Sequence, residues 1–110
     1  MKRRSAYRDR PRDMERIAWI WTLPCAARTL GQCYGRIEAD HAGRRPVGRK
    51  APDDTCIPMC SRHHAQRGSF KGPFRLWDQQ RMRHWLATMV EHYQKLYEEH
   101  LRPEENGDQR

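Results

Sequence analysis

Long apolar runs are missing from this 110-residue sequence. Its most apolar stretch, Ile-Ala-Trp-Ile-Trp at residues 17–21, is far shorter than the roughly 18–20 residues that a transmembrane helix requires. Basic residues precede this stretch, but no small-residue cleavage site typical of an export signal follows it. We therefore expect a soluble, intracellular protein of the cytoplasm that does not enter a membrane.

Apolar side chains are scarce in general. Only 36% of the residues are hydrophobic and 9% are aromatic, whereas 33% are charged. A chain of this length suffices for one domain but not for two. Because so polar a chain buries a thin core, small domains of this kind commonly depend on a bound metal or on disulfides. We expect a single domain over residues 13–103, reinforced in one of these ways.

Acidic residues are in the minority. The chain has 22 Lys+Arg against 14 Asp+Glu, which gives a formal net charge of +8. The basic residues gather in three stretches, residues 2–12, 44–50 and 62–83. A polyanion favours such clusters because each neutralised phosphate releases condensed counterions. The charge pattern therefore favours a nucleic-acid partner.

Cysteine occurs only four times. Two disulfides would suit a secreted protein, but the missing export signal and the nearby histidines favour metal binding over disulfides or over four reduced, metal-free thiols. The candidate ligands of a structural Zn²⁺ are Cys25, Cys33, Cys60 and His63, since zinc prefers four soft or borderline donors. Cys56 is an alternative to one of them, although its expected place in a buried strand favours a core thiol.

Both ends of the chain are polar. Residues 1–12 read as a disordered basic arm and residues 104–110 as a flexible tail. Between them, Asp13 is placed to cap a short helix over Met14–Trp21, which Pro24 terminates. The alternation of aromatic and aliphatic residues in this segment also fits a strand.

Two short strands and a short helix are expected in the middle of the chain. Residues 36–41 and 55–59 have the length and apolar pattern of strands. Residues 42–54 contain two glycines and two prolines and are expected to form a loop. Residues 60–67 are expected to form a helix and residues 68–73 another loop. The arrangement predicts an α+β fold.

A long amphipathic helix is expected over residues 77–101, which Pro103 terminates. Its apolar residues recur at three- and four-residue spacing: Met82, Trp85, Leu86, Met89, Val90, Tyr93, Leu96 and Tyr97. We expect this stripe to cover the core, with a homodimer seam as the alternative use.

Asp40, His41 and His64 form a candidate catalytic group. An Asp-His pair at a strand end facing a histidine on a helix suits phosphodiester hydrolysis. Asp40 and His64 would hold a divalent cation on the scissile phosphate. His41 points to the opposite side of the strand and is free to accept a proton from the attacking water, because imidazoles exchange protons near neutral pH.

The order of these features is more specific than any one of them. The sequence Ile-Glu-Ala-Asp-His-Ala-Gly at residues 37–43, followed by Cys-Ile-Pro-Met-Cys-Ser-Arg-His-His at residues 56–64, resembles the HNH endonucleases. It is most similar to small phage-type members with an upstream cysteine pair and a Pro-[Leu/Met]-Cys-x-x-His-His helix start. Residues 48–55 are also similar, and the resemblance extends over residues 19–77.

The resemblance implies a ββα-metal core over residues 36–68 in a DNA endonuclease of phage or prophage origin. It implies that Asp40 and His64 hold catalytic Mg²⁺ or Mn²⁺, that His41 is the general base, and that His63 is the fourth zinc ligand. Two positions depart from the family pattern. Thr55 stands where a middle Asn orients the base or reaches the metal, so Thr55 is assigned this catalytic role, with Asp54 as a neighbour that compensates. Gly68 stands where some members carry a further histidine.

The basic loop is expected to contact DNA. Its side chains Arg44, Arg45, Arg49 and Lys50 would bind phosphates, which positions DNA without reading its sequence. DNA rather than RNA follows from the family alone. Two other functions fit the sequence, namely a catalytically inactive zinc-stabilised DNA-binding module and a zinc-containing protein that binds a partner through its C-terminal helix.

Overall fold

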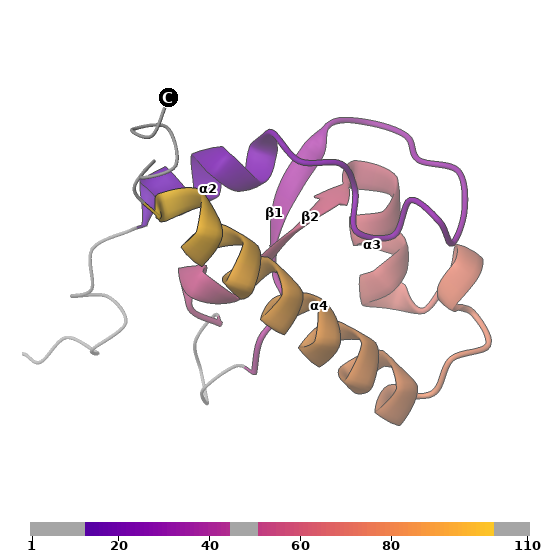
Figure 1. The fold of residues 1–110 in the computed structure, drawn as a ribbon. Coiled ribbons are helices and arrows are strands. Elements are labelled where there is room, and N and C mark those ends of the chain that lie inside the picture. Colours follow the sequence, from indigo (N-terminus) through magenta and orange to yellow (C-terminus); the bar gives the residue numbers. More distant parts are fainter. Residues whose placement is uncertain (1–12, 45–50, 103–110) are drawn as a thin grey trace, which may run out of the picture.

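The computed structural model describes residues 13–44 and 51–102 (Figure 1). The expected basic arm at residues 1–12 and the tail at residues 104–110 lie outside the described residues. Arg45, Arg49 and Lys50 of the expected DNA-binding loop also lie outside them.

A two-stranded antiparallel sheet forms the centre of the fold. Strand β1 spans Ile37–His41 and strand β2 spans Cys56–Cys60. In their register Asp40 is opposite Ile57 and His41 is opposite Cys56. Each strand lies within one residue of the expected range. All five residues of β2 are buried, because helices cover this strand.

Helix α2 spans Met14–Trp21, as the helical interpretation of this segment predicts. It begins where the Asp13 side chain accepts a hydrogen bond from the backbone N–H of Arg16. Ile17 and Ile20, which are three residues apart, are buried and pack with Cys56 of the sheet. A strand would have placed these two side chains on opposite faces.

Helix α3 spans Ser61–Ser69 and follows β2 directly. The Cys60 sulfur caps its first turn by accepting a hydrogen bond from the backbone N–H of His63. The helix starts one residue later and ends two residues later than the sequence predicts, and its C-cap is Phe70, which has a left-handed backbone conformation. A 3₁₀-helix, η2, follows at Gly72–Phe74, partly within the segment that was expected to be a loop.

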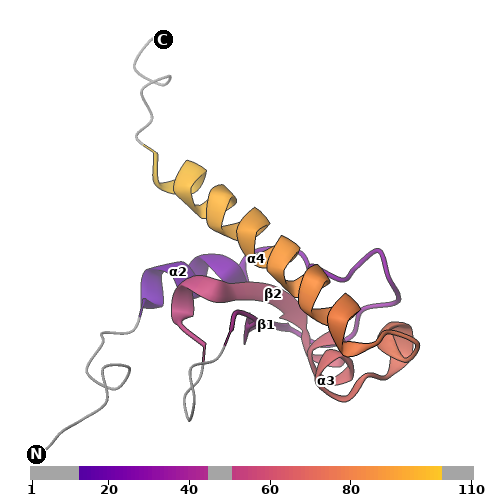
Figure 2. The ribbon, with the colours of Figure 1, turned by 90° about the horizontal axis from the view of Figure 1, so that it is seen from below.

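Helix α4 spans Gln79–Leu101 and begins at Asp78, whose side chain accepts a hydrogen bond from the backbone N–H of Arg81. Trp77 therefore precedes the helix that was expected to include it. The buried side chains of α4 are Met82, Leu86, Tyr93 and Tyr97. Figure 2 shows α4 crossing one face of the hairpin, and in Figure 1 α2 and α3 flank the hairpin on its two sides. The apolar stripe of α4 thus covers the core.

The described residues form a small α+β domain with a two-stranded sheet and three α-helices. Its main core joins Ile57 and Met59 of β2 with Phe74 and Leu86. Within the described part of the chain, none of the helices combines the length and the apolar character needed to cross a membrane.

Phe74 and Leu76 provide a test of this packing. Phe74 is fully buried against Trp77 and Trp85, whereas Leu76 is 83% exposed. We expect Phe74→Ala to lower the free energy of unfolding by about 3–5 kcal/mol, because it leaves a cavity. Leu76→Ala should change it by less than about 0.5 kcal/mol. Urea denaturation of both variants at matched metal content measures the difference, and equal losses would contradict the packing described.

Candidate functional site

Three cysteines and one histidine gather beside the junction of β2 and α3. The donor atoms of Cys25, Cys33, Cys60 and His63 all lie within 4.8 Å of one another. His63 Nδ1 is 3.4 Å from Cys25 Sγ, 3.7 Å from Cys33 Sγ and 3.3 Å from Cys60 Sγ. In a tetrahedral zinc site the N···S separation is about 3.5 Å, from the usual Zn–S and Zn–N bond lengths. These four residues are therefore placed to bind a metal ion, and the geometry is compatible with structural zinc.

The backbone holds Cys25 in the cluster although it comes from a distant part of the sequence. The Ala26 N–H donates to the Pro58 carbonyl at 2.7 Å, which attaches this loop to β2. The N–H groups of Ala27 and Cys60 each donate to Cys25 Sγ at 3.3 Å. These two hydrogen bonds fix the position of the Cys25 sulfur in the cluster.

The pKa shifts of His63, Cys33 and Cys60 are also compatible with a bound cation. Burial, followed by the charge of Arg62, lowers the pKa of His63, which keeps its ring neutral and able to bind a metal. Partial burial and then the Cys25 thiol raise the pKa of Cys33 to about 12. For Cys60, burial raises the pKa, but the backbone N–H groups of His63 and Tyr34 outweigh it and the net pKa is lowered. Accumulated thiolates repel one another, and a divalent cation would offset this repulsion.

Cys56 does not take part in this cluster. It is buried in β2 and lies instead near His41 and Asp53. The alternative in which Cys56 replaces one of the four candidate ligands therefore does not match the geometry.

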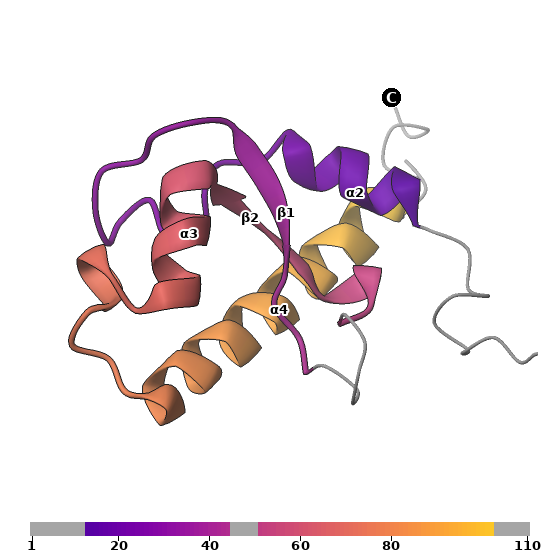
Figure 3. The same ribbon diagram turned by 180° about the vertical axis from the view of Figure 1, so that it is seen from behind.

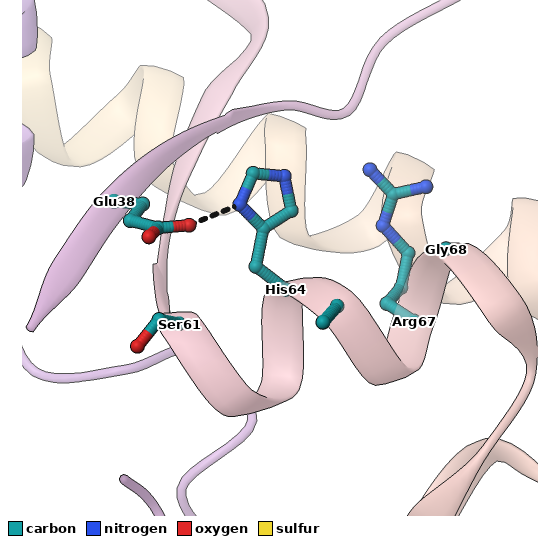
Figure 4. Close-up of a pocket in the computed structure, with 6 residues that line it drawn as sticks. Glu38, Ser61, His64, Arg67 and Gly68 are labelled. Atoms are coloured by element: carbon teal, nitrogen blue, oxygen red, sulfur yellow. Dashed lines mark hydrogen bonds and ion pairs between the residues drawn. The ribbon is translucent and has the colours of Figure 1, made fainter. Parts of the chain in front are cut away.

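Asp40 and His64 face each other across β1 and α3. Asp40 Oδ1 is 3.5 Å from His64 Nε2, and the Asp40 side chain is 1% exposed. The other ring nitrogen of His64, Nδ1, is 2.7 Å from Glu38 Oε1, as the dashed line in Figure 4 shows. Glu38, Ser61 and His64 line a cleft of about 420 Å³. A histidine held by a carboxylate at one nitrogen and facing an acidic ligand with the other is an arrangement that protein metal sites use.

The contribution of Glu38 was not part of the sequence prediction. The alternation of side chains along β1 could have identified it, because Glu38 and Asp40 are two residues apart and so lie on the same face of the strand.

Arg67 is a second unanticipated member of this group. Its Nε donates to Asp40 Oδ2 at 3.0 Å, and its Nη2 pairs with Asp40 Oδ1. The spacing from His64 was the available signal, because residues three apart lie on the same face of a helix. A carboxylate has about four lone-pair positions, so Asp40 Oδ1 can face both Arg67 and a cation beside His64 Nε2. Asp40 and His64 therefore offer two donor atoms beside the Arg67 guanidinium.

Gly68 lies on α3 at the rim of the same cleft, next to Arg67 in Figure 4. A Cβ atom added here would meet nothing within 4 Å. Position 68, where some members of the resembled family carry a further histidine, is therefore open space in this structure.

His41 points to the other side of β1. Its Nε2 is 2.8 Å from Asp53 Oδ1, and the two side chains are 17% and 11% exposed. Asp53 belongs to the 3₁₀-helix η1, Asp53–Thr55, a segment in which the sequence predicts loop and the start of a strand. The Thr55 hydroxyl, predicted to assist His41, donates instead to the Pro52 carbonyl at 2.7 Å. Among the described residues, Asp53 therefore contacts the His41 ring in place of Thr55 or the exposed Asp54.

Arg44 is the one residue of the expected DNA-binding set that falls within the described residues. It is exposed to solvent and follows β1 by three residues.

Comparisons of the chain with protein-family models, with curated proteins and with solved structures find no match.

Metal analysis tests the cysteine and histidine cluster. We expect purified protein to retain about one zinc per chain and to lose thermal stability when a chelator removes it. Cys60→Ser should lose this zinc because it removes a ligand. Cys56→Ser removes a buried thiol of the same chemistry and should keep the zinc. Retention of zinc by Cys60→Ser, or its loss from Cys56→Ser alone, would assign the site to other residues.

Proposed function

We propose that this protein is an HNH-type DNA endonuclease that hydrolyses phosphodiester bonds with a divalent cation. The observation that carries the proposal is that the two faces of β1 present different groups at the end of the strand. On one side of the strand Asp40 faces His64, which lines a cleft, and on the other side His41 has a carboxylate partner. Because Asp40 and His41 are consecutive, their Cα atoms are only about 3.8 Å apart. We propose that a phosphate bound at the end of this strand contacts the cation on one side and the His41 imidazole on the other.

Asp40 and His64 are the proposed ligands of Mg²⁺ or Mn²⁺, with Glu38 fixing the orientation of the His64 ring. When bound there, the cation would act as a Lewis acid on the scissile phosphate and stabilise the leaving oxygen. Arg67 pairs with Asp40 and lines the same cleft, so its guanidinium would lie beside the bound phosphate.

His41 is the proposed general base. It would accept a proton from a water molecule as the water oxygen attacks phosphorus, and the bond from phosphorus to the leaving oxygen would break. Its neighbours support this role, because a base must be held in position and Asp53 contacts one ring nitrogen.

The DNA substrate is supported by the charge of the chain and by the resemblance. The net charge of +8 favours a polyanion, and Arg44 is exposed close to the end of β1. We propose that Arg44, Arg45, Arg49 and Lys50 bind the DNA backbone. The zinc would be structural, since its four ligands are not those of the cleft.

A plasmid-nicking assay tests the proposed reaction. We expect purified protein to nick supercoiled DNA with Mg²⁺ or Mn²⁺ but not with EDTA. His41→Ala should reduce the rate constant by about a hundredfold or more, because it removes the base. His84→Ala is the matched control, since His84 is an exposed histidine on α4. Both variants must match the wild type in zinc content and thermal stability.

One observation favours a second candidate function, a zinc-stabilised DNA-binding module of the same fold without catalysis. Arg67 already neutralises the buried Asp40, as it would in a site that no longer uses a cation. This function would be preferred if wild type and His41→Ala bound DNA equally and neither nicked it with any metal.

The pairing of Asp40 with Arg67 gives a direct test of cation binding. Arg67→Ala leaves a buried carboxylate without its partner, which we expect to cost about 3 kcal/mol of stability. A cation at Asp40 would offset this loss, so Mg²⁺ should raise the Tm of Arg67→Ala by several degrees more than that of the wild type.

Arg62→Ala is the matched control, because Arg62 is an exposed residue of the same helix. Adding Asp40→Asn to Arg67→Ala should abolish the response to Mg²⁺. An equal response of Arg67→Ala and Arg62→Ala would show that the cation does not bind at Asp40.

A further inference from the structure

We infer that Asp53 is the positioning residue for His41 and that it makes Nδ1 the ring nitrogen that accepts the proton. This inference rests on the proposed function and deepens it. Its basis is the 2.8 Å contact between His41 Nε2 and Asp53 Oδ1, between two side chains that are both largely buried.

The Asp53 carboxylate is fixed at both of its oxygens. Oδ1 contacts His41, and Oδ2 accepts a hydrogen bond from the backbone N–H of Asp13 at 2.9 Å. Asp13 is the residue that caps α2, so the start of that helix is bound to the turn that carries Asp53. Figure 3 shows the start of α2 close to this turn. The carboxylate therefore has little freedom to rotate away from His41.

Hydrogen bonds within η1 also fix the turn that carries Asp53. Both the backbone N–H and the hydroxyl of Thr55 donate to the Pro52 carbonyl, at 3.0 and 2.7 Å. Thr55 thus acts on the general base indirectly, by shaping η1, rather than by contacting the imidazole. Asp53 takes over the orienting role for which the sequence suggested Thr55 or Asp54.

The chemistry of the pair selects the tautomer of His41. An ionised carboxylate can only accept hydrogen bonds, so the Nε2 that faces it carries the hydrogen. Nδ1 then has the lone pair and is the atom that takes the proton from the attacking water. When it does so, the ring becomes a cation beside the Asp53 carboxylate, and this charge pair favours proton transfer.

Asp53→Asn and Asp54→Asn form a matched pair of variants. Each removes one negative charge from the same turn, but only Asp53 contacts His41. The amide of Asp53→Asn can still accept from the Asp13 N–H, so the fold should be retained. We expect Asp53→Asn to lower the kcat for plasmid nicking by about tenfold or more, with KM and DNA affinity nearly unchanged. Asp54→Asn should keep the wild-type kcat.

Nitrogen-15 NMR of the wild type adds a readout that does not depend on cleavage. The inference expects the neutral His41 ring to carry its hydrogen on Nε2. A hydrogen on Nδ1, or a wild-type kcat in Asp53→Asn while His41→Ala is inactive, would overturn it. If the wild type itself fails to nick DNA, the proposed function fails, and the role of Asp53 in positioning a general base fails with it, whichever tautomer the spectrum shows.

Discussion

Cys60 ends β2, caps α3 through its sulfur and contributes one donor to the cysteine and histidine cluster. These three roles coincide at a single residue, so the direction in which α3 leaves the sheet is tied to the geometry of the cluster. His63 and His64 are consecutive on that helix, and one faces the cluster while the other faces the cleft. The position of His64 against Asp40 therefore depends on the same four donors that hold the loop of Cys25 and Cys33.

Strand β1 keeps two groups of polar side chains apart, because they lie on its two opposite faces. On the face toward α3, the carboxylates of Glu38 and Asp40 meet one imidazole and one guanidinium. On the opposite face, the Asp53 carboxylate meets the His41 imidazole, with the Cys56 thiol nearby. Alternation along one short strand is sufficient to keep these groups apart, although Asp40 and His41 are neighbours in the chain. Each histidine is oriented by a carboxylate that comes from a different element.

Much of the fold could be predicted from local signals. Asp13 and Pro24 delimit the first helix in the sequence, and the three- and four-residue spacing identifies the last one. The donor set of Cys25, Cys33, Cys60 and His63 followed from the chemistry of the residue types and from the resemblance. The residue at which α3 ends was predicted less accurately. Gly68 and Ser69 are residue types typical of loops, but they continue the helical hydrogen bonds as far as Phe70.

The partners of the site residues were harder to predict. Glu38 and Arg67 had spacing signals that were open to recognition, since each shares a face with a residue already identified. Asp53 had none, because Asp53, Asp54 and Thr55 are consecutive polar residues and only the three-dimensional turn decides which of them meets His41. That choice also depends on Asp13, which is 40 residues away in the sequence.

Gly68 is a glycine that neither the backbone conformation nor the packing of α3 explains. A glycine within a helix costs about 0.5–1 kcal/mol relative to alanine, yet the backbone at Gly68 is not in the left-handed region and the space around it is empty. Neither the helix nor its packing requires glycine here. Position 68 is therefore open to evolution and to engineering, because a side chain that reaches the cleft can be introduced there without any repacking of the core.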